Sequence, residues 1–223
     1  MNMIFMRESE QLKEAVLRLA GEVEFRLAEV LKAIGECDAE ALRAWVERDT
    51  EIDEWEVQIE EECLKILALH QPVARDLRFV VAVLKINNDL ERIGDIVVNI
   101  AERGMRMAEF PATPQQETCM RMGRLVCAML KDSLDALIGL DAEKAAAVIA
   151  RDDEVDKLKA GVIESVVWQM TVTDTGSVAE ALILVHSVAR DLERIGDHAT
   201  NIAEDVTYLV DGSIIRHKGR MSG

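Results

Sequence analysis

The chain has 223 residues and a formal net charge of −16, because 42 acidic side chains face only 26 lysines and arginines. This excess of acids argues against a nucleic-acid-binding protein, since a phosphate backbone is bound by clustered lysines and arginines. With 49% apolar residues, 4% aromatics and three prolines, the composition predicts an all-α protein that can bury a core.

The first half of the chain predicts three long helices. Apolar side chains recur at every third or fourth position over about residues 8–34, which is the period of a helix with one buried face. We expect Gly35 to end this helix and Asp38 to cap the next, which runs over about residues 38–69. A glutamine–proline pair then breaks the pattern, and the third helix covers about residues 74–107.

The second half repeats this plan after a proline-containing linker at residues 110–114. Helical patterns cover about residues 115–138, 142–170 and 177–210. The prediction is therefore an all-α fold of six long helices forming two tandem three-helix bundles related by internal duplication. The expected parts are a first repeat at residues 1–109, a second repeat at residues 115–212 and a C-terminal tail at residues 213–223.

A repeated heptapeptide is the clearest sign of that duplication. The sequence Asp-Leu-Glu-Arg-Ile-Gly-Asp occurs at Asp89–Asp95 and again at Asp191–Asp197, and each copy is followed three residues later by Asn-Ile-Ala-Glu. Eleven of these fourteen positions are identical at an offset of 102 residues. Composition bias does not produce such agreement, so the chain is a tandem duplication.

The acids of the heptapeptide fall on one face of each predicted helix, nearly opposite an apolar seam. This stripe consists of Glu91, Asp95, Asn99 and Glu102 in the first copy and of Glu193, Asp197, Asn201 and Glu204 in the second. The first aspartates of the two copies, Asp89 and Asp191, lie nearer the apolar flank and are expected to be structural.

The preceding helix of each half carries a matching pair of aspartates four residues apart. The pairs are Asp49 with Asp53 and Asp152 with Asp156. In an isolated helix, two acids at this spacing repel one another by roughly 0.2–0.5 kcal/mol. Clustered carboxylates without a balancing base need a cation, so each half predicts a metal site formed by the stripe and its aspartate pair.

Two simpler readings compete with a metal site. The stripe can be an ordinary solvated acidic face, and Arg92 and Arg194 can neutralise their acidic neighbours by ion pairing. The mid-helix glycines Gly94 and Gly196 each cost about 1 kcal/mol against alanine, which indicates the close approach of another helix or of a bound ion. His198 adjoins Asp197, and we expect it to be a helix-surface residue rather than a ligand.

Catalytic signatures are weak. The chain contains neither the Glu-x-x-His pattern of di-iron bundles nor a His-Glu-x-x-His motif, a nucleophile elbow or a phosphate-binding glycine loop. We therefore expect a protein that is not an enzyme. No apolar run approaches the ~20 residues of a membrane span and no signal peptide is recognisable, so a cytoplasmic location is expected.

At these residues the chain resembles the PhoU family of phosphate-transport regulators. The resemblance is carried by the two Leu-Glu-Arg-Ile-Gly-Asp-x-x-x-Asn-Ile-Ala-Glu stretches and by the aspartate pairs of the preceding helices, and it covers nearly the whole chain. It implies a cytoplasmic, non-catalytic negative regulator that links the phosphate ABC transporter, through its ATPase, to a sensor histidine kinase. It also implies a homodimer.

The resemblance further implies metal clusters held by acidic side chains at the surface of each bundle. The implied ligands are Asp49, Asp53, Glu91, Asp95, Asn99, Asp152, Asp156, Glu193, Asp197 and Asn201. Oxygen ligation suits divalent or trivalent Mg, Ca, Mn or Fe, with Zn less favoured because histidine and cysteine are missing from the set. In the first copy the variable positions after Asp95 are more apolar than in the second, so the two sites need not be equal. Two alternatives stay open: a metal-dependent hydrolase, and a metal-free helical adaptor with acidic binding faces.

Overall fold

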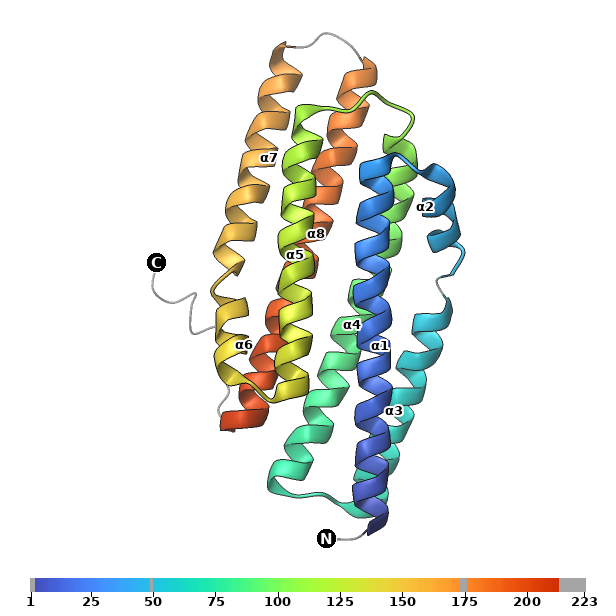
Figure 1. Ribbon diagram of the computed structural model, residues 1–223, viewed down its shortest axis with the longest axis vertical. Coiled ribbons are helices and arrows are strands. Elements are labelled where there is room, and N and C mark those ends of the chain that lie inside the picture. The colour runs from blue at the N-terminus through green and yellow to red at the C-terminus, as the bar shows by residue number, and fades with distance from the viewer. Residues whose placement is uncertain (1–2, 49, 173–175, 213–223) are drawn as a thin grey trace.

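Within the residues that the computed structural model describes, 3–48, 50–172 and 176–212, all regular secondary structure is α-helix, and short turns join the helices. The predicted all-α fold with six long helices is confirmed (Figure 1). The long helices are α1 (Met3–Glu36), α3 (Thr50–His70), α4 (Ala74–Met107), α5 (Pro114–Gly139), α7 (Asp152–Val172) and α8 (Gly176–Asp211). Two short helices, α2 (Ala39–Val46) and α6 (Ala142–Ile149), precede α3 and α7. The predicted tail at residues 213–223 lies outside the described residues.

Each half of the chain packs as a three-helix bundle. Helices α1, α3 and α4 pack on one another, and α5 and α7 pack on α8 and on each other in the second half. The short helix α2 lies against α1 and α4, while α6 lies against α5 and α8. The two bundles meet along α4 and α8 and along α1 and α5, and their buried apolar residues form one continuous core (Figure 1).

The second helix of each half is divided, which the sequence analysis did not predict. Continuous helices were expected over residues 38–69 and 142–170, but α3 begins only at Thr50 and α7 at Asp152. The apolar period continues across both divisions, so periodicity alone could not reveal them. Each division places a new helix N-terminus beside the aspartates, where carboxylates are stabilised by the helix dipole.

The ends of the first helices also differ from expectation. Gly35 lies within α1, and Cys37 is the residue that adopts a left-handed backbone, with φ of 54°. In the second half Gly139 is the last residue of α5, and Leu140 takes φ of 48°. Asp38 caps α2 as expected, since its side chain accepts two backbone N–H groups. The turn is therefore made by non-glycine residues at equivalent positions of the two halves.

Polar contacts buried between α4 and α8 hold the two bundles together. Asp89 on α4 is 7% exposed, and its Oδ1 lies 2.7 Å from Nδ1 of His198 and 3.3 Å from Nδ2 of Asn201 on α8. Asp191 on α8 is 2% exposed and accepts a hydrogen bond from Arg103 on α4. Burial raises the pKa of Asp191, and neighbouring arginines partly offset that effect. The structural role expected for both aspartates is confirmed, whereas the surface role expected for His198 is wrong.

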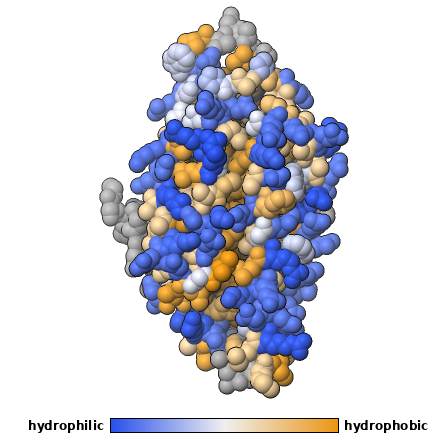
Figure 2. Space-filling model, viewed as in Figure 1, coloured by the Kyte–Doolittle hydropathy of each residue, from blue (hydrophilic) through white to orange (hydrophobic). Residues whose placement is uncertain are grey.

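Polar and charged groups dominate the face of the molecule that Figure 2 draws. Figure 2 shows one face of the molecule that is largely hydrophilic, with apolar groups gathered in a band along its middle, over α1 and α5. Among the described helices, none combines the length and the low charge needed to cross a bilayer.

Gly94 allows α3 to pack closely on α4. A Cβ atom at this position would lie 2.9 Å from Cδ1 and 3.2 Å from Cγ2 of Ile52 on α3. At Gly196, the equivalent atom would lie 3.5 Å from Cγ1 of Val155, which is ordinary contact. The glycine of the first repeat therefore serves the close approach of a neighbouring helix, and this approach brings the acids of α3 and α4 together.

Alanine substitutions at the two glycines should have different effects on stability. Gly196→Ala is expected to raise the free energy of unfolding by up to about 1 kcal/mol, through the better helix propensity of alanine. Gly94→Ala gains the same propensity but overpacks against Ile52, at a cost of about 1–3 kcal/mol, so it should be neutral or destabilising. Urea titration of both variants measures the difference, and Gly94→Ala combined with Ile52→Val should recover the loss. Equal stabilisation by the two single substitutions would contradict the close contact at Gly94.

Candidate metal centre

Three of the predicted ligands come together in the first repeat. Asp53 lies near the start of α3, and Glu91 and Asp95 lie one turn apart on α4. One carboxylate oxygen from each of them lies within 4.8 Å of the others. Asp53 is exposed, while Glu91 and Asp95 are half-buried. Because the Gly94–Ile52 contact sets the spacing of α3 and α4, the close packing of the core determines the separation of these carboxylates.

Among the residues that the structure describes, Arg92 is the only basic side chain that forms ion pairs with these three carboxylates. Its Nε lies 3.3 Å from Glu91 and its Nη1 lies 3.7 Å from Asp95, and its side chain is 53% exposed. An exposed ion pair at such distances contributes little, about 0–1 kcal/mol. The ion pairing of Arg92 that was expected from the sequence is therefore present, but one arginine neutralises only part of the charge of three carboxylates.

Glu56 is a further acid near these three carboxylates, outside their grouping within 4.8 Å, and it was not predicted from the sequence. It lies one turn after Asp53 on α3, and its negative charge acts on Glu91. Asn87 on α4 donates from Nδ2 to the main-chain oxygen of Glu56 at 2.9 Å and to its Oε1 at 3.3 Å. Asn87 stands four residues before Glu91, so extending the acid stripe by one helical turn would have found this pair.

Electrostatic strain accompanies this gathering of acids. Burial raises the pKa of Glu91, and the charge of Asp95 raises it further against the opposing effect of Arg92. Burial also raises the pKa of Glu56, with Glu60 and Asp53 adding to the effect. A carboxylate in this position is stabilised either by taking up a proton or by a bound cation.

The residues of the first repeat fit an oxygen-ligated metal ion. All four acids offer hard carboxylate oxygens, which is the donor chemistry of Mg, Ca and Mn sites. Asn87 is 1% exposed, and its Oδ1 is buried without a hydrogen-bond partner among the described residues. A buried acceptor without a donor is costly, and an ion near this site would offset the cost.

One other predicted ligand of the first repeat, Asn99, is not part of that grouping. Asn99 is exposed, and its Nδ2 donates to the main-chain oxygen of Asp95 at 2.8 Å, one turn earlier on α4. Asp49 lies outside the described residues.

The second repeat places its predicted ligands differently. Glu193 on α8 is paired with Lys159 on α7, whose Nζ lies 2.7 Å from its Oε1. Asp156 is exposed on α7, and Asp197 is half-buried on α8. Asn201 donates to Asp89 of the other repeat. Over residues 3–48, 50–172 and 176–212, three carboxylates meet at metal-ligand separation only in the first repeat.

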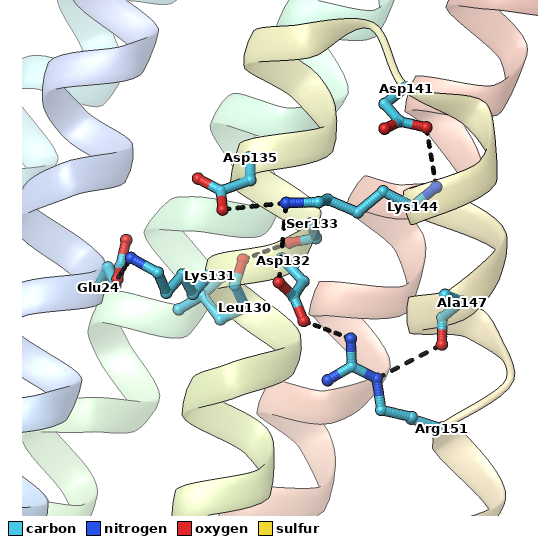
Figure 3. A network of polar contacts seen from close by, with 10 residues as sticks. All are labelled: Glu24, Leu130, Lys131, Asp132, Ser133, Asp135, Asp141, Lys144, Ala147 and Arg151. Carbon is cyan, nitrogen blue, oxygen red and sulfur yellow. Dashed lines mark hydrogen bonds and ion pairs between the residues drawn. The ribbon is translucent and has the colours of Figure 1, made fainter.

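The junction before α7, where Asp152 begins the helix, is fixed by salt bridges to α5 (Figure 3). Arg151 pairs with Asp132, and its Nε donates to the main-chain oxygen of Ala147 at 3.4 Å. Lys144 on α6 lies 3.2 Å from Asp135 in the same network (Figure 3). The second repeat thus ties its aspartate-bearing helix to α5 through an arginine of the junction itself.

The first repeat fixes the corresponding junction with a different arginine. Arg26 of α1 is 3% exposed and donates to the main-chain oxygen of Arg48 and to Glu51, both at 2.8 Å. Its guanidinium also lies 5.9 Å from the ring centroid of Trp45 on α2. Arg26 of α1 therefore fixes the position of the N-terminus of α3 and adds a positive charge beside it. Asp53 lies in the first turn of the same helix.

The family model and related proteins that match this chain belong to the PhoU family. The PhoU domain matches residues 16–104 and again residues 119–206. The chain is 37% identical over 217 residues to the phosphate-specific transport system accessory protein PhoU homolog of Pseudomonas putida, covering 96% of this chain and 84% of that protein. It is 43% identical over 165 residues to the homolog of the same name from Deinococcus radiodurans, covering 74% and 76% of the two chains.

Solved structures show the same fold. The crystal structure of PhoU from Pseudomonas aeruginosa superposes with a TM-score of 0.88 at 34% identity, covering 94% of this chain and 100% of that one. The phosphate transport system regulatory protein PhoU from Streptococcus pneumoniae superposes with a TM-score of 0.85 at 28% identity, covering 95% and 99%.

The raised pKa of Glu91 gives a prediction about pH. The folded protein binds the Glu91 proton more tightly than the unfolded chain does, so stability falls as the pH rises from the ordinary value of 4.5 through the raised pKa. Glu91→Gln cannot ionise and should raise the Tm of chelator-treated protein at pH 7, with an advantage that shrinks towards pH 4.5. Thermal unfolding followed by circular dichroism measures this. Glu61→Gln, at an exposed position of α3, is the control, and a Glu91→Gln advantage that does not depend on pH would contradict the prediction.

Proposed function

The chain belongs to the PhoU family, and we propose that it is a metal-binding cytoplasmic regulator of phosphate uptake and of phosphate-starvation signalling. The observation that carries the metal-binding part is the grouping of Asp53, Glu91 and Asp95 within 4.8 Å across two helices. The regulatory part is supported by the relatives, which are named as accessory proteins of the phosphate-specific transport system. The heptapeptide supplies two of these acids, Glu91 and Asp95, and both of its copies lie within the residues that match the PhoU domain.

The proposed action is protein–protein contact rather than catalysis. The partners are the ATPase of the phosphate ABC transporter and a sensor histidine kinase, and the protein works as a homodimer in negative regulation. An accessory role is supported by the description of the Streptococcus pneumoniae structure as a regulatory protein of the phosphate transport system. The chain's acidic surface, with a net charge of −16, suits basic patches on such partners.

Asp53, Glu91 and Asp95 would hold the metal ion in the first repeat, with Glu56 beside them. The ion would supply positive charge that neutralises carboxylates of α3 and α4 and so joins the two helices. This role is structural: the acids position the helices, and the surface that the helices present to a partner depends on their spacing. A hydrolase would instead need a nucleophile or base beside the metal that is not itself a ligand, and the repeated acids of the heptapeptide are either proposed ligands or, at Asp89 and Asp191, buried between α4 and α8.

Metal content tests the first part of the proposal. Protein purified without chelator should contain Mg, Ca, Mn, Fe or Zn by plasma mass spectrometry, and Glu91→Gln/Asp95→Asn should lose most of it. Glu36→Gln/Glu61→Gln removes the same charge from exposed positions on α1 and α3 and should retain the metal. Equal metal content in all three proteins would remove the proposed site and leave the metal-free adaptor.

Recovery of partners tests the second part. A tagged form of the chain, isolated from phosphate-replete cells of its own host, should carry with it the transporter ATPase or the sensor kinase. Both should be reduced several-fold in phosphate-starved cells, where a negative regulator is released. Recovery of neither protein under both conditions would contradict the regulatory role, whatever the metal content.

A further inference from the structure

The two repeats differ in charge at one position of the acidic site. Asp53 and Asp156 are equivalent at an offset of 103 residues, and the same offset relates Glu56 to Lys159. The first repeat therefore has a carboxylate where the second has an ammonium. Lys159 lies 2.7 Å from Glu193 of the second heptapeptide, whereas the negative charge of Glu56 acts on Glu91 of the first.

Lys159 is well placed to neutralise the second site. Its side chain is 26% exposed and that of Glu193 is 20% exposed, so the pair is less screened than a surface salt bridge. Arg194, the equivalent of Arg92, lies 3.8 Å from Asp191, on the side of α8 that meets the first repeat. The cation that serves Glu193 is therefore a lysine supplied by α7.

A second substitution accompanies the first. Asn87, which donates to Glu56, is replaced in the second repeat by Ala189 at the offset of 102 residues that holds for α4 and α8. Asn87 is buried, and its Oδ1 has no hydrogen-bond partner among the described residues. The first repeat thus carries an extra acid and a polar residue that supports it, and the second carries neither.

We propose that the two acidic sites are chemically distinct: the first repeat binds a divalent cation with Glu56 as an additional oxygen ligand, and Lys159 is the built-in cation of the second. This inference rests on the proposed metal-binding function and adds to it which repeat is the metal site. A metal ion entering the second site has to displace an ammonium that is already paired with Glu193, and it meets one acid fewer. Its affinity there is lower by about tenfold or more, the effect of a like charge a few ångströms away.

The test isolates the second repeat by disabling the first. In Glu91→Gln/Asp95→Asn protein, any remaining Mn²⁺ binding reports the second site, and titration calorimetry or electron paramagnetic resonance measures its Kd. Adding Lys159→Glu to this background should tighten Mn²⁺ binding about tenfold or more. Adding Lys157→Glu, the same charge change at an exposed position two residues away on α7, should have a much smaller effect. With an intact heptapeptide, Glu56→Gln should weaken the first site.

Stability without metal gives an independent readout and a check on folding. In the presence of chelator, Lys159→Gln should lower the Tm because Glu193 loses its partner, whereas Glu56→Gln should raise it because the cluster loses one acid. Circular dichroism verifies that each variant is helical, and Lys159→Gln replaces Lys159→Glu in the titration if the latter does not fold.

The outcomes separate this inference from the proposed function. If wild-type protein binds Mn²⁺ through Glu91 and Asp95 but Lys159→Glu does not tighten the second site, the proposed metal site stands and the inequality of the repeats is overturned. Equal wild-type affinities at the two repeats would have the same meaning. If neither the wild type nor any variant binds Mn²⁺, the proposed metal site fails and this inference fails with it.

Discussion

The contact between α4 and α8 is the constraint on which the rest of the structure depends. Two aspartates that begin the repeated heptapeptide are buried there, and each is satisfied by side chains of the other repeat: Asp89 by His198 and Asn201, and Asp191 by Arg103. A buried carboxylate tolerates little displacement from its partners, so these contacts fix the rotation of α4 and α8 about their axes. That rotation decides where the next acid of each heptapeptide lies: Glu91 is near Asp53 of α3, and Glu193 is paired with Lys159 of α7. In each heptapeptide, therefore, the first aspartate joins the two bundles, and the acids after it belong to the charged site of their own repeat.

Much of this could be predicted from the sequence, because it depends on periodicity and on internal identity. The duplication, the six long helices and the structural role of Asp89 and Asp191 follow from patterns within single helices. What could not be predicted depends on relations between helices. The divisions before Thr50 and Asp152 leave the apolar period intact, and Glu56 and Lys159 acquire meaning only when α3 and α7 are packed beside Glu91 and Glu193. The contact of His198 with Asp89 joins residues 109 apart in the chain, so no pattern within one helix indicates it.

Identical motifs do not impose identical chemistry. Glu91 and Glu193 occupy the same position of the same heptapeptide, yet the helix packed against each presents opposite charge. The repeated element provides a common carboxylate, and the less strictly repeated helix before it decides whether this carboxylate meets acids or a lysine. The junctions before α3 and α7 differ in the same way. In the first repeat Arg26 of α1 binds the junction, whereas in the second repeat Arg151 of the junction binds α5. In this chain the backbone plan is duplicated faithfully, while the side chains around it have been exchanged.

The residues that follow α1 and α5 also share a backbone conformation without sharing a side chain. Cys37 and Leu140 stand at the same register of the two halves and adopt the same backbone conformation, although that conformation costs an L-residue roughly 1 kcal/mol or more and glycine is available next to the turn in both halves. A left-handed residue is a common way to end a helix, but the same Asp-Ala-Glu sequence follows both turns, at Asp38–Glu40 and Asp141–Glu143, so each turn lies within the duplicated unit. What the two halves share at this point is a shape of the backbone rather than the identity of a side chain.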